Sequence, residues 1–188
     1  THLVTLVRAL AADLLQREPA ELHTLNLYLA IEVQRCRELH LAGRLADAAE
    51  LAHEAISSLD LDSLHPDGTS RPTFEEIALA HDISSLAQVL LVAGERERCV
   101  RLSQLVLDAF PANDSNVAPV RIACLGKIAV CEVLDRNRPA ALRHAREAVA
   151  LSEYHGSSSA DIGWALAALL VTDSTIDHAD MYRRVDDI

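Results

Sequence analysis

Aromatic residues and glycine are scarce in this sequence, and their scarcity argues against a β-rich fold. The chain has two Phe, one Trp, three Tyr, six Gly and six Pro among its 188 residues. A β-sandwich normally needs aromatic and β-branched residues along its strands and glycine at its many turns. Half of the residues (50%) are hydrophobic, and most of these are Leu, Ala, Val and Ile. Because Leu and Ala favour helix and this apolar fraction is enough for a core, the composition predicts an all-α protein.

Basic residues are outnumbered by acidic ones, which argues against nucleic acid as a partner. The formal net charge is −11 at pH 7, and a charge of this sign repels a phosphate backbone. A glycine-rich phosphate-binding loop and a Gly-x-Ser-x-Gly motif are both missing from the sequence. We therefore predict no direct binding of nucleic acid.

A long apolar run, a signal peptide and a disulfide framework are also missing. The longest uncharged apolar stretch, 163–171, is too short to span a bilayer. The cysteines form no Cys-x-x-Cys motif, and each lies within an apolar helical pattern, as is typical of buried, reduced thiols. We expect a cytoplasmic protein without membrane contact. The chain does not begin with methionine, so we expect it to be a segment of a larger protein.

Residue pairs with the spacing of catalytic or metal-binding motifs occur without the partners that such sites require. Cys36 and His40 lie on one helix face, but a closed zinc site needs two further ligands. Glu50 and His53 form a single Glu-x-x-His pair, whereas a di-iron bundle needs two such pairs and more glutamates. The serines at 157–159 fit a helix N-cap better than a nucleophile. We predict no catalytic site, no metal and no cofactor.

Apolar residues recur at three- and four-residue steps along nearly the whole chain, which predicts about eight or nine helices. The first helix spans the apolar residues at 3–14, and Pro19 separates it from a long second helix that ends at Gly43. A capping box formed by Thr73 and Glu76 marks the start of the fourth helix. The remaining helices are expected to begin after Gly43, after Gly94, near Val117, near Pro139, near Ala160 and near Asp177.

A long helix, a tight turn and a shorter alanine-rich helix occur three times. The three turns align at Gly43, Gly94 and Arg136. At two matching positions of the helix that follows each turn, the residues are small or of medium size. These residues are Ala48, Cys99 and Ala141 at the first position and Ala55, Val106 and Ala148 at the second. We expect them to let the two helices of each pair approach closely.

The segment Gly-Arg-Leu-Ala-Asp-Ala-Ala-Glu-Leu-Ala-His-Glu-Ala, residues 43–55, resembles the second helix of a tetratricopeptide repeat. Pro19 and Pro111 fit the proline that ends such repeats. The turns at 43, 94 and 136 are farther apart than the family period of about 34 residues. In addition, the family's large aromatic residue in the first helix is missing. Such lengthened repeats are similar to those in sensor domains of large bacterial transcription regulators.

The resemblance implies a fold and a ligand surface. The fold is a right-handed superhelix of antiparallel helix pairs in one domain, with a repeat-like core over about 1–155 and capping helices over about 156–188. In the tetratricopeptide family the first helices of the pairs line a concave groove that holds the ligand. The groove residues that this implies are Asn26, Tyr28, Arg37, His40, His81, Ser84, Gln88 and Lys127. For each of them, an ordinary solvated helix face is the alternative interpretation.

Four functions are compatible with these observations. The first is a non-catalytic scaffold that binds a protein segment or peptide, as part of a bacterial regulatory protein. The second is a small-molecule effector pocket in the same groove, and the third is an all-α enzyme. The fourth is dimerisation through the apolar helix around Trp164, because a helix so apolar is usually covered by neighbours or by a partner.

Overall fold

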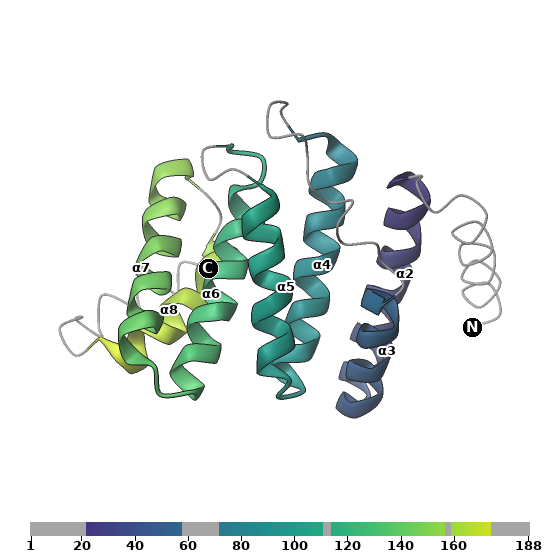
Figure 1. The fold of residues 1–188 in the computed structure, drawn as a ribbon, viewed down its shortest axis with the longest axis horizontal. Helices are drawn as coiled ribbons and strands as arrows, with labels where there is room; N and C mark the ends of the chain where they lie inside the picture. Colours follow the sequence, from purple (N-terminus) through teal and green to yellow (C-terminus); the bar gives the residue numbers. More distant parts are fainter. Residues whose placement is uncertain (1–21, 58–71, 111–113, 157–158, 174–188) are drawn as a thin grey trace. The chain divides into compact units, whose positions relative to one another are not determined.

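The computed structural model describes residues 22–57, 72–110, 114–156 and 159–173. Every regular element in these ranges is an α-helix, which confirms the all-α class for this part of the chain (Figure 1). These ranges contain seven helices, against the eight or nine expected for the whole chain. The helices expected at 3–14 and from 177 onward, and the prolines at 19 and 111, lie outside the described residues. Contacts between helices divide the chain into two compact units, Thr1–Glu95 and Arg96–Ile188.

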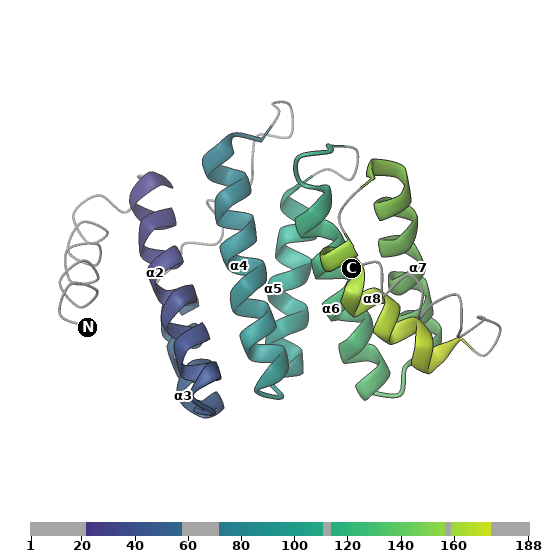
Figure 2. The ribbon, with the colours of Figure 1, turned by 180° about the vertical axis from the view of Figure 1, so that it is seen from behind.

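The first unit contains helices α2 (Leu22–Leu41), α3 (Leu45–Ser57) and α4 (Phe74–Val92). Helices α2 and α3 form a hairpin, and α4 lies beside α2 (Figures 1 and 2). The side-chain amide of Asn26, near the start of α2, donates a hydrogen bond of 2.9 Å to the carbonyl of Glu75 in the first turn of α4. Because residues at the ends of the two helices also meet, as shown below, α2 and α4 run in the same direction.

The second unit contains helices α5 (Arg96–Ala109), α6 (Ala118–Leu134), α7 (Arg138–His155) and α8 (Ser159–Thr172). Helices α5, α6 and α7 run alternately up and down, and α8 packs against both α6 and α7 (Figure 2). The end of α5 is tied to the start of α6, because the guanidinium of the buried Arg121 donates to two carbonyls at the end of α5. These carbonyls belong to Leu107, at 2.6 Å, and to Phe110.

The helix ends follow from local sequence signals. The hydroxyl of Thr73 accepts a 3.2 Å hydrogen bond from the Glu76 N–H, and the Glu76 carboxylate accepts a 2.6 Å bond from the Thr73 N–H. This reciprocal pair is the predicted capping box at the start of α4. Gly156, at the end of α7, has φ 63°, the left-handed conformation expected of a helix C-cap.

The three turns aligned in the sequence share one backbone conformation. Each places a residue in the left-handed region, with φ 73° at Gly43, 86° at Gly94 and 61° at Arg136. At the first turn, the Gly43 N–H donates to the His40 carbonyl at 2.9 Å and the Arg44 N–H to the Leu39 carbonyl at 2.9 Å, the two bonds of a Schellman motif. The same bonds recur from Gly94 to Leu91, Glu95 to Leu90, Arg136 to Val133 and Asn137 to Glu132.

The small residues that follow these turns are all buried. Each has a relative exposure of 0% or 1%, and the set comprises Ala48, Ala55, Cys99, Val106, Ala141 and Ala148. In the α2–α3 hairpin the approach is close enough for the Cys36 thiol to donate a 3.5 Å hydrogen bond to the carbonyl of Ala48. A larger side chain at such a position would separate the two helices.

Helix α8 approaches α6 most closely at Gly126. A Cβ atom added at Gly126 would lie 2.8 Å from the Cβ of Trp164 and 2.9 Å from the backbone nitrogen of Ala165. Carbon and nitrogen atoms that are not bonded do not approach so closely, so only glycine fits there without a shift of the backbone. The hydrogen atom of Gly126 therefore sets the distance between α6 and α8.

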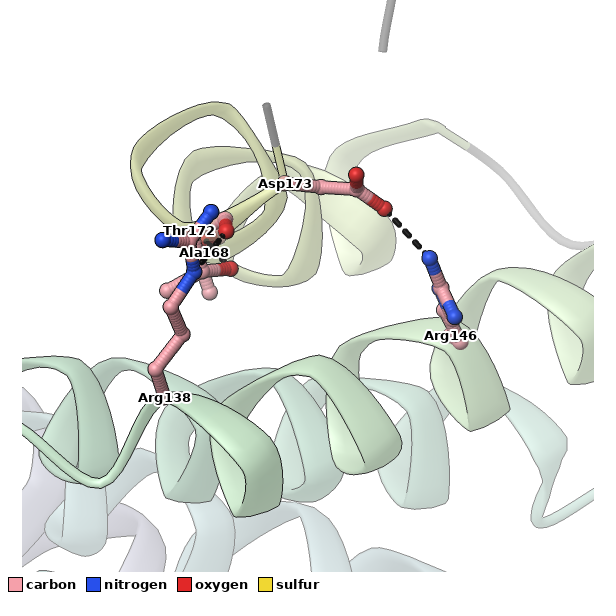
Figure 3. A network of polar contacts seen from close by, with 5 residues as sticks. All are labelled: Arg138, Arg146, Ala168, Thr172 and Asp173. Atoms are coloured by element: carbon pink, nitrogen blue, oxygen red, sulfur yellow. Dashed lines mark hydrogen bonds and ion pairs between the residues drawn. The ribbon is translucent and has the colours of Figure 1, made fainter. Parts of the chain in front are cut away.

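The other end of α8 is held by two arginines of α7 (Figure 3). The Nε of Arg138 donates to the carbonyl of Thr172, and Arg146 pairs with the buried carboxylate of Asp173 at 2.5 Å. The Thr172 hydroxyl donates to the carbonyl of Ala168 at 2.7 Å. Carbonyls at a helix C-terminus lack partners within the helix and carry partial negative charge, so guanidinium groups satisfy them well.

Most of the apolar surface of α8 is covered within its own unit. The side chains of Ile162, Ala165, Leu166, Ala168 and Leu169 are buried against α6 and α7. Trp164 is half-buried, and Val171 is the large hydrophobic residue of α8 that stays exposed, at 71%. The apolar face that suggested a dimer interface is therefore largely used in intramolecular packing.

Left-handed backbone conformation at the turns predicts opposite effects for two substitutions. The variant Gly43→Ala should lower the free energy of unfolding by about 1 kcal/mol, and Arg136→Gly should raise it by about 0.5–1 kcal/mol, because a Cβ atom is strained at positive φ. Urea unfolding followed by circular dichroism measures both changes. An effect of the same sign for the two variants would contradict the turn geometry.

Close packing at Gly126 predicts a second contrast. We expect Gly126→Ala to lower the free energy of unfolding by about 1–3 kcal/mol, because the methyl group would clash with α8. Gly163→Ala is the matched control within α8, since a Cβ atom there meets nothing within 4 Å and alanine favours helix by about 1 kcal/mol. Similar urea midpoints for the two variants would refute the close approach of α6 and α8.

Candidate binding site between helices α2 and α4

A cavity opens between the last two turns of α2 and the second half of α4, entirely within the first unit. Its volume is about 260 Å³. On each helix the lining residues recur at steps of one, three and four, so each set occupies one helix face. They are Arg37, His40 and Leu41 from α2, and Ser85, Gln88, Val89 and Val92 from α4. We refer to these residues as the α2–α4 pocket.

The α2–α4 pocket has four polar side chains, of which Arg37 acts electrostatically on Asp82. Within the described part of the chain, no hydrogen bond or ion pair involves the side chain of Arg37, His40, Ser85 or Gln88. Together they offer a guanidinium, an imidazole, a hydroxyl and an amide. Uncommitted donors and acceptors that converge on one cavity are typical of a ligand site.

Arg37 differs from the other arginines of α2 and the following turn. Arg35 pairs with Glu32 at 2.7 Å, and Arg44 pairs with Asp47 at 2.5 Å. Among the residues that the structure describes, no carboxylate lies within ion-pair distance of Arg37. The pocket therefore contains a guanidinium that can pair with a ligand.

Apolar side chains form the rest of the pocket. Val89 is buried, while Leu41 is 86% exposed and Val92 is 36% exposed. A leucine so exposed at the edge of a cavity gains from any apolar group that covers it, by about 25 cal/mol per Å² of apolar surface removed from water. The pocket thus combines an apolar wall with polar groups that can orient a ligand.

The carboxyl group of Asp82 lies one turn before Ser85 on α4 and is half-buried. Burial raises the pKa of this carboxyl group from 3.8 to about 6, although the positive charge of Arg37 acts in the opposite direction. Removal from water disfavours the ionised form of a carboxyl group. Asp82 is therefore a titratable group next to the pocket that changes charge close to neutral pH.

Of the eight groove residues expected from the sequence, the structure brings Arg37, His40 and Gln88 together in the α2–α4 pocket. His81 is exposed on α4 outside the lining. Asn26 is half-buried, and its amide group is used to bind the backbone of Glu75. These two residues lie on the expected helices but outside the pocket.

The other three expected residues are buried rather than presented to a ligand. Relative exposure is 8% for Tyr28, 5% for Ser84 and 2% for Lys127, and Lys127 belongs to the second unit. Ser84 was assigned one position away from the true lining residue, Ser85. The reason is that the buried surface of α4 extends beyond its main apolar stripe to the flank that contains Ser84 and Leu91, whereas His81 and Gln88 on the opposite side stay exposed.

Four residues of the pocket were missed by the sequence analysis: Leu41, Ser85, Val89 and Val92. Three of them are apolar, whereas every groove residue expected from the sequence carries a polar group. The signal that could have indicated them is the pair Leu41 and Val92, two large apolar residues at equivalent places directly before the turns at 43 and 94. Apolar residues before two successive turns suggest one shared apolar patch.

The cysteines and the residue types that bind metals can be placed within the described part of the chain. The four cysteines are buried and free, and burial together with the charge of Glu32 raises the pKa of Cys36 to about 11. A hydrogen bond with Cys131, together with burial, raises the pKa of Cys99 as well, and the same hydrogen bond lowers the pKa of Cys131. Across the described helices, no group of three or more His, Cys, Asp or Glu is arranged to hold a metal ion.

None of the helices in the described ranges is long and apolar enough to cross a membrane. No protein-family model matches the chain, and no curated protein or solved structure matches it either. The α2–α4 pocket is therefore the feature from which a function can be inferred.

The raised pKa of Asp82 predicts a pH-dependent effect of Asp82→Asn. Because the folded state binds the Asp82 proton more tightly than the unfolded chain does, the stabilising contribution is present below about pH 4 and is lost as pH rises through about 6. We expect Asp82→Asn to raise the free energy of unfolding by about 1–2 kcal/mol at pH 7.5 and by much less at pH 4. Urea unfolding at the two pH values measures this difference. An equal change at both would show that burial does not disfavour the Asp82 charge.

Proposed function

We propose that this chain is a non-catalytic binding module that holds a protein segment or peptide at the α2–α4 pocket. The observation that carries the proposal is the convergence of four uncommitted polar side chains on an apolar cavity. The volume of about 260 Å³ lies below the range of about 300–1,000 Å³ that is usual for small-molecule sites. It suits one large side chain of an extended partner, whose remaining residues would run along α2 and α4.

We further propose that the helices belong to a right-handed, tetratricopeptide-like stack from a bacterial regulatory protein, with a role in transcription regulation. Three turns have a residue with positive φ at the same position and the same pattern of hydrogen bonds, which supports a repeating hairpin unit. The parallel arrangement of α2 and α4 supports it too, because the first helices of successive pairs lie side by side in such stacks. Four buried free thiols support a reducing, cytoplasmic location.

A small-molecule effector is the second candidate for the same pocket. It is favoured by the uncommitted guanidinium of Arg37 next to the His40 imidazole, since two such groups can fix a compact polar molecule without any peptide backbone. A thermal-shift screen of metabolites distinguishes the two candidates. A compound that shifts the melting temperature of the wild type but not that of Gln88→Ala would favour the small-molecule effector hypothesis.

A peptide-display selection against the full chain tests the proposed function. We expect enriched peptides whose affinity falls at least about tenfold when Arg37 and Gln88 are both replaced by alanine, because charge-assisted hydrogen bonds are lost. The matched control is Arg101→Ala with Gln34→Ala, which removes an exposed arginine and an exposed amide elsewhere. Fluorescence anisotropy with a labelled selected peptide measures the affinities. Equal binding by the pocket variant and the control would reject this pocket.

The apolar wall gives an independent test with the same peptide. Leu41→Ser should weaken binding by about threefold to tenfold, because the peptide would cover less apolar surface. Phe74→Ser is the control, since Phe74 is 82% exposed and Leu41 is 86% exposed, yet Phe74 lies at the opposite end of α4. A larger loss for the control than for Leu41→Ser would place the ligand away from the pocket.

A further inference from the structure

The α2–α4 pocket contains a cation in a part of the chain that is otherwise acidic. Arg37 lines the cavity and has no ion-pair partner among the described residues, and the net charge of the whole chain is −11. Asp82 stands close enough for its ionisation to be favoured by Arg37, yet no ion pair joins the two side chains and Asp82 is not part of the lining. The free protein thus keeps a weakly engaged guanidinium facing the cavity.

We propose that the pocket selects an apolar side chain with a neighbouring carboxylate, and that the ligand carboxylate becomes the ion-pair partner of Arg37, close to Asp82. This inference rests on the proposed function and adds to it the class of ligand and its regulation by pH. The apolar side chain fills the space between Leu41, Val89 and Val92. The carboxylate meets Arg37, with Gln88 as a further donor.

An anionic ligand fits the lining better than a cationic one. The groups that face the cavity are a guanidinium, an imidazole, an amide and a hydroxyl, all of which can donate hydrogen bonds to a carboxylate. A cation would have to find its counter-charge at Asp82, which lies outside the lining, and would be repelled by Arg37. A guanidinium can also form two parallel hydrogen bonds with one carboxylate. Both are charge-assisted, so they are stronger than hydrogen bonds between neutral groups.

Proton uptake follows from the position of Asp82. A second negative charge next to a half-buried carboxyl group disfavours its ionised form further, so the bound state holds the proton more tightly than the free state. Arg37 is the charged group that acts on Asp82 from α2. The other titratable side chains on the helices packed against α4 are His23, Tyr28, Glu32, Arg35, Cys36, Glu38 and His40 of α2 and Asp47, Glu50, His53 and Glu54 of α3.

Binding of blocked dipeptides, followed by ¹H–¹⁵N NMR shifts of the full chain, tests the inference. The probes are N-acetyl-Leu-Asp-amide, its neutral isostere with Asn and its cationic counterpart with Lys, each in both residue orders. We expect the Asp probes to bind at least about threefold more tightly than the Asn probes at pH 5, with shifts at Arg37, Gln88 and Val92. The probe carboxylate remains ionised at this pH because its pKa is about 3.9.

The pH dependence provides the second readout. For the wild type, affinity for the Asp probes should be at least about threefold higher at pH 5 than at pH 7.5, because Asp82 is then neutral. In Asp82→Asn the affinity at pH 7.5 should equal that of the wild type at pH 5 and should change little with pH. The variant His40→Gln separates any contribution of the pocket imidazole, and it should keep the pH dependence that Asp82 causes.

The outcomes separate the two proposals. If no probe shifts residues of the α2–α4 pocket at any pH, the proposed function fails at this site, and the inference fails with it. If Asn or Lys probes bind as tightly as Asp probes, peptide binding stands and the preference for a carboxylate is overturned. If the pH dependence persists in Asp82→Asn or disappears in His40→Gln, the assignment of the proton to Asp82 is overturned.

Discussion

Close approach of helices across alanine-lined contacts is the constraint on which the rest of the structure depends. A Schellman turn reverses the chain within a few residues, so the helices on its two sides must pack at short distance from their first turn onward. Ala48 and Ala55 allow this in the α2–α3 hairpin, and Ala141 and Ala148 allow it in the α6–α7 hairpin. Since small side chains contribute little apolar surface each, the hairpins gain stability through many dispersion contacts at short range.

Short hairpins also determine where a binding site can form. Helix α2 has its small-residue partner α3 on one side, so its remaining face is free to pack beside α4. The two helices meet through Asn26 and Glu75 at one end and leave the α2–α4 pocket at the other. The residues that line the pocket come from the last two turns of α2 and the second half of α4, and the polar ones among them are at least partly exposed.

The backbone conformation could be predicted from the sequence more completely than the residues of the binding site. Glycines at 43 and 94 and the capping box at Thr73 are local signals. They act through hydrogen bonds between residues close in the sequence, which form whatever the tertiary packing. Arg136 was placed in a turn by alignment alone, and its φ of 61° agrees with that placement. The division of the contacts after Glu95 has no local signal, because it depends on which helices touch.

Side-chain positions were harder to predict wherever a helix is covered on more than one side. The periodicity of α4 gives a stripe at Leu79, Ile83, Leu86 and Leu90, but Ala80, Ser84, Ala87 and Leu91 are buried as well. Serine and alanine occur both in cores and on surfaces, so their presence in a sequence does not indicate burial. Ser84 was therefore expected at the surface. Lys127 was expected to face the groove, but it is buried because α6 is buried along almost its whole length.

The acidic character of the chain bears on how a carboxylate-bearing partner could be selected. At physiological ionic strength the Debye length is about 8 Å, so the net charge of −11 acts mainly on ligands close to the surface. An acidic segment without an apolar anchor meets this repulsion and gains only the polar contacts with Arg37 and Gln88. A segment that also buries a side chain against Leu41, Val89 and Val92 gains apolar contact that is independent of salt. Selectivity then comes from the requirement for both features: the surrounding carboxylates weaken the binding of every anionic ligand, and only a ligand with an apolar side chain gains the contact that offsets this repulsion.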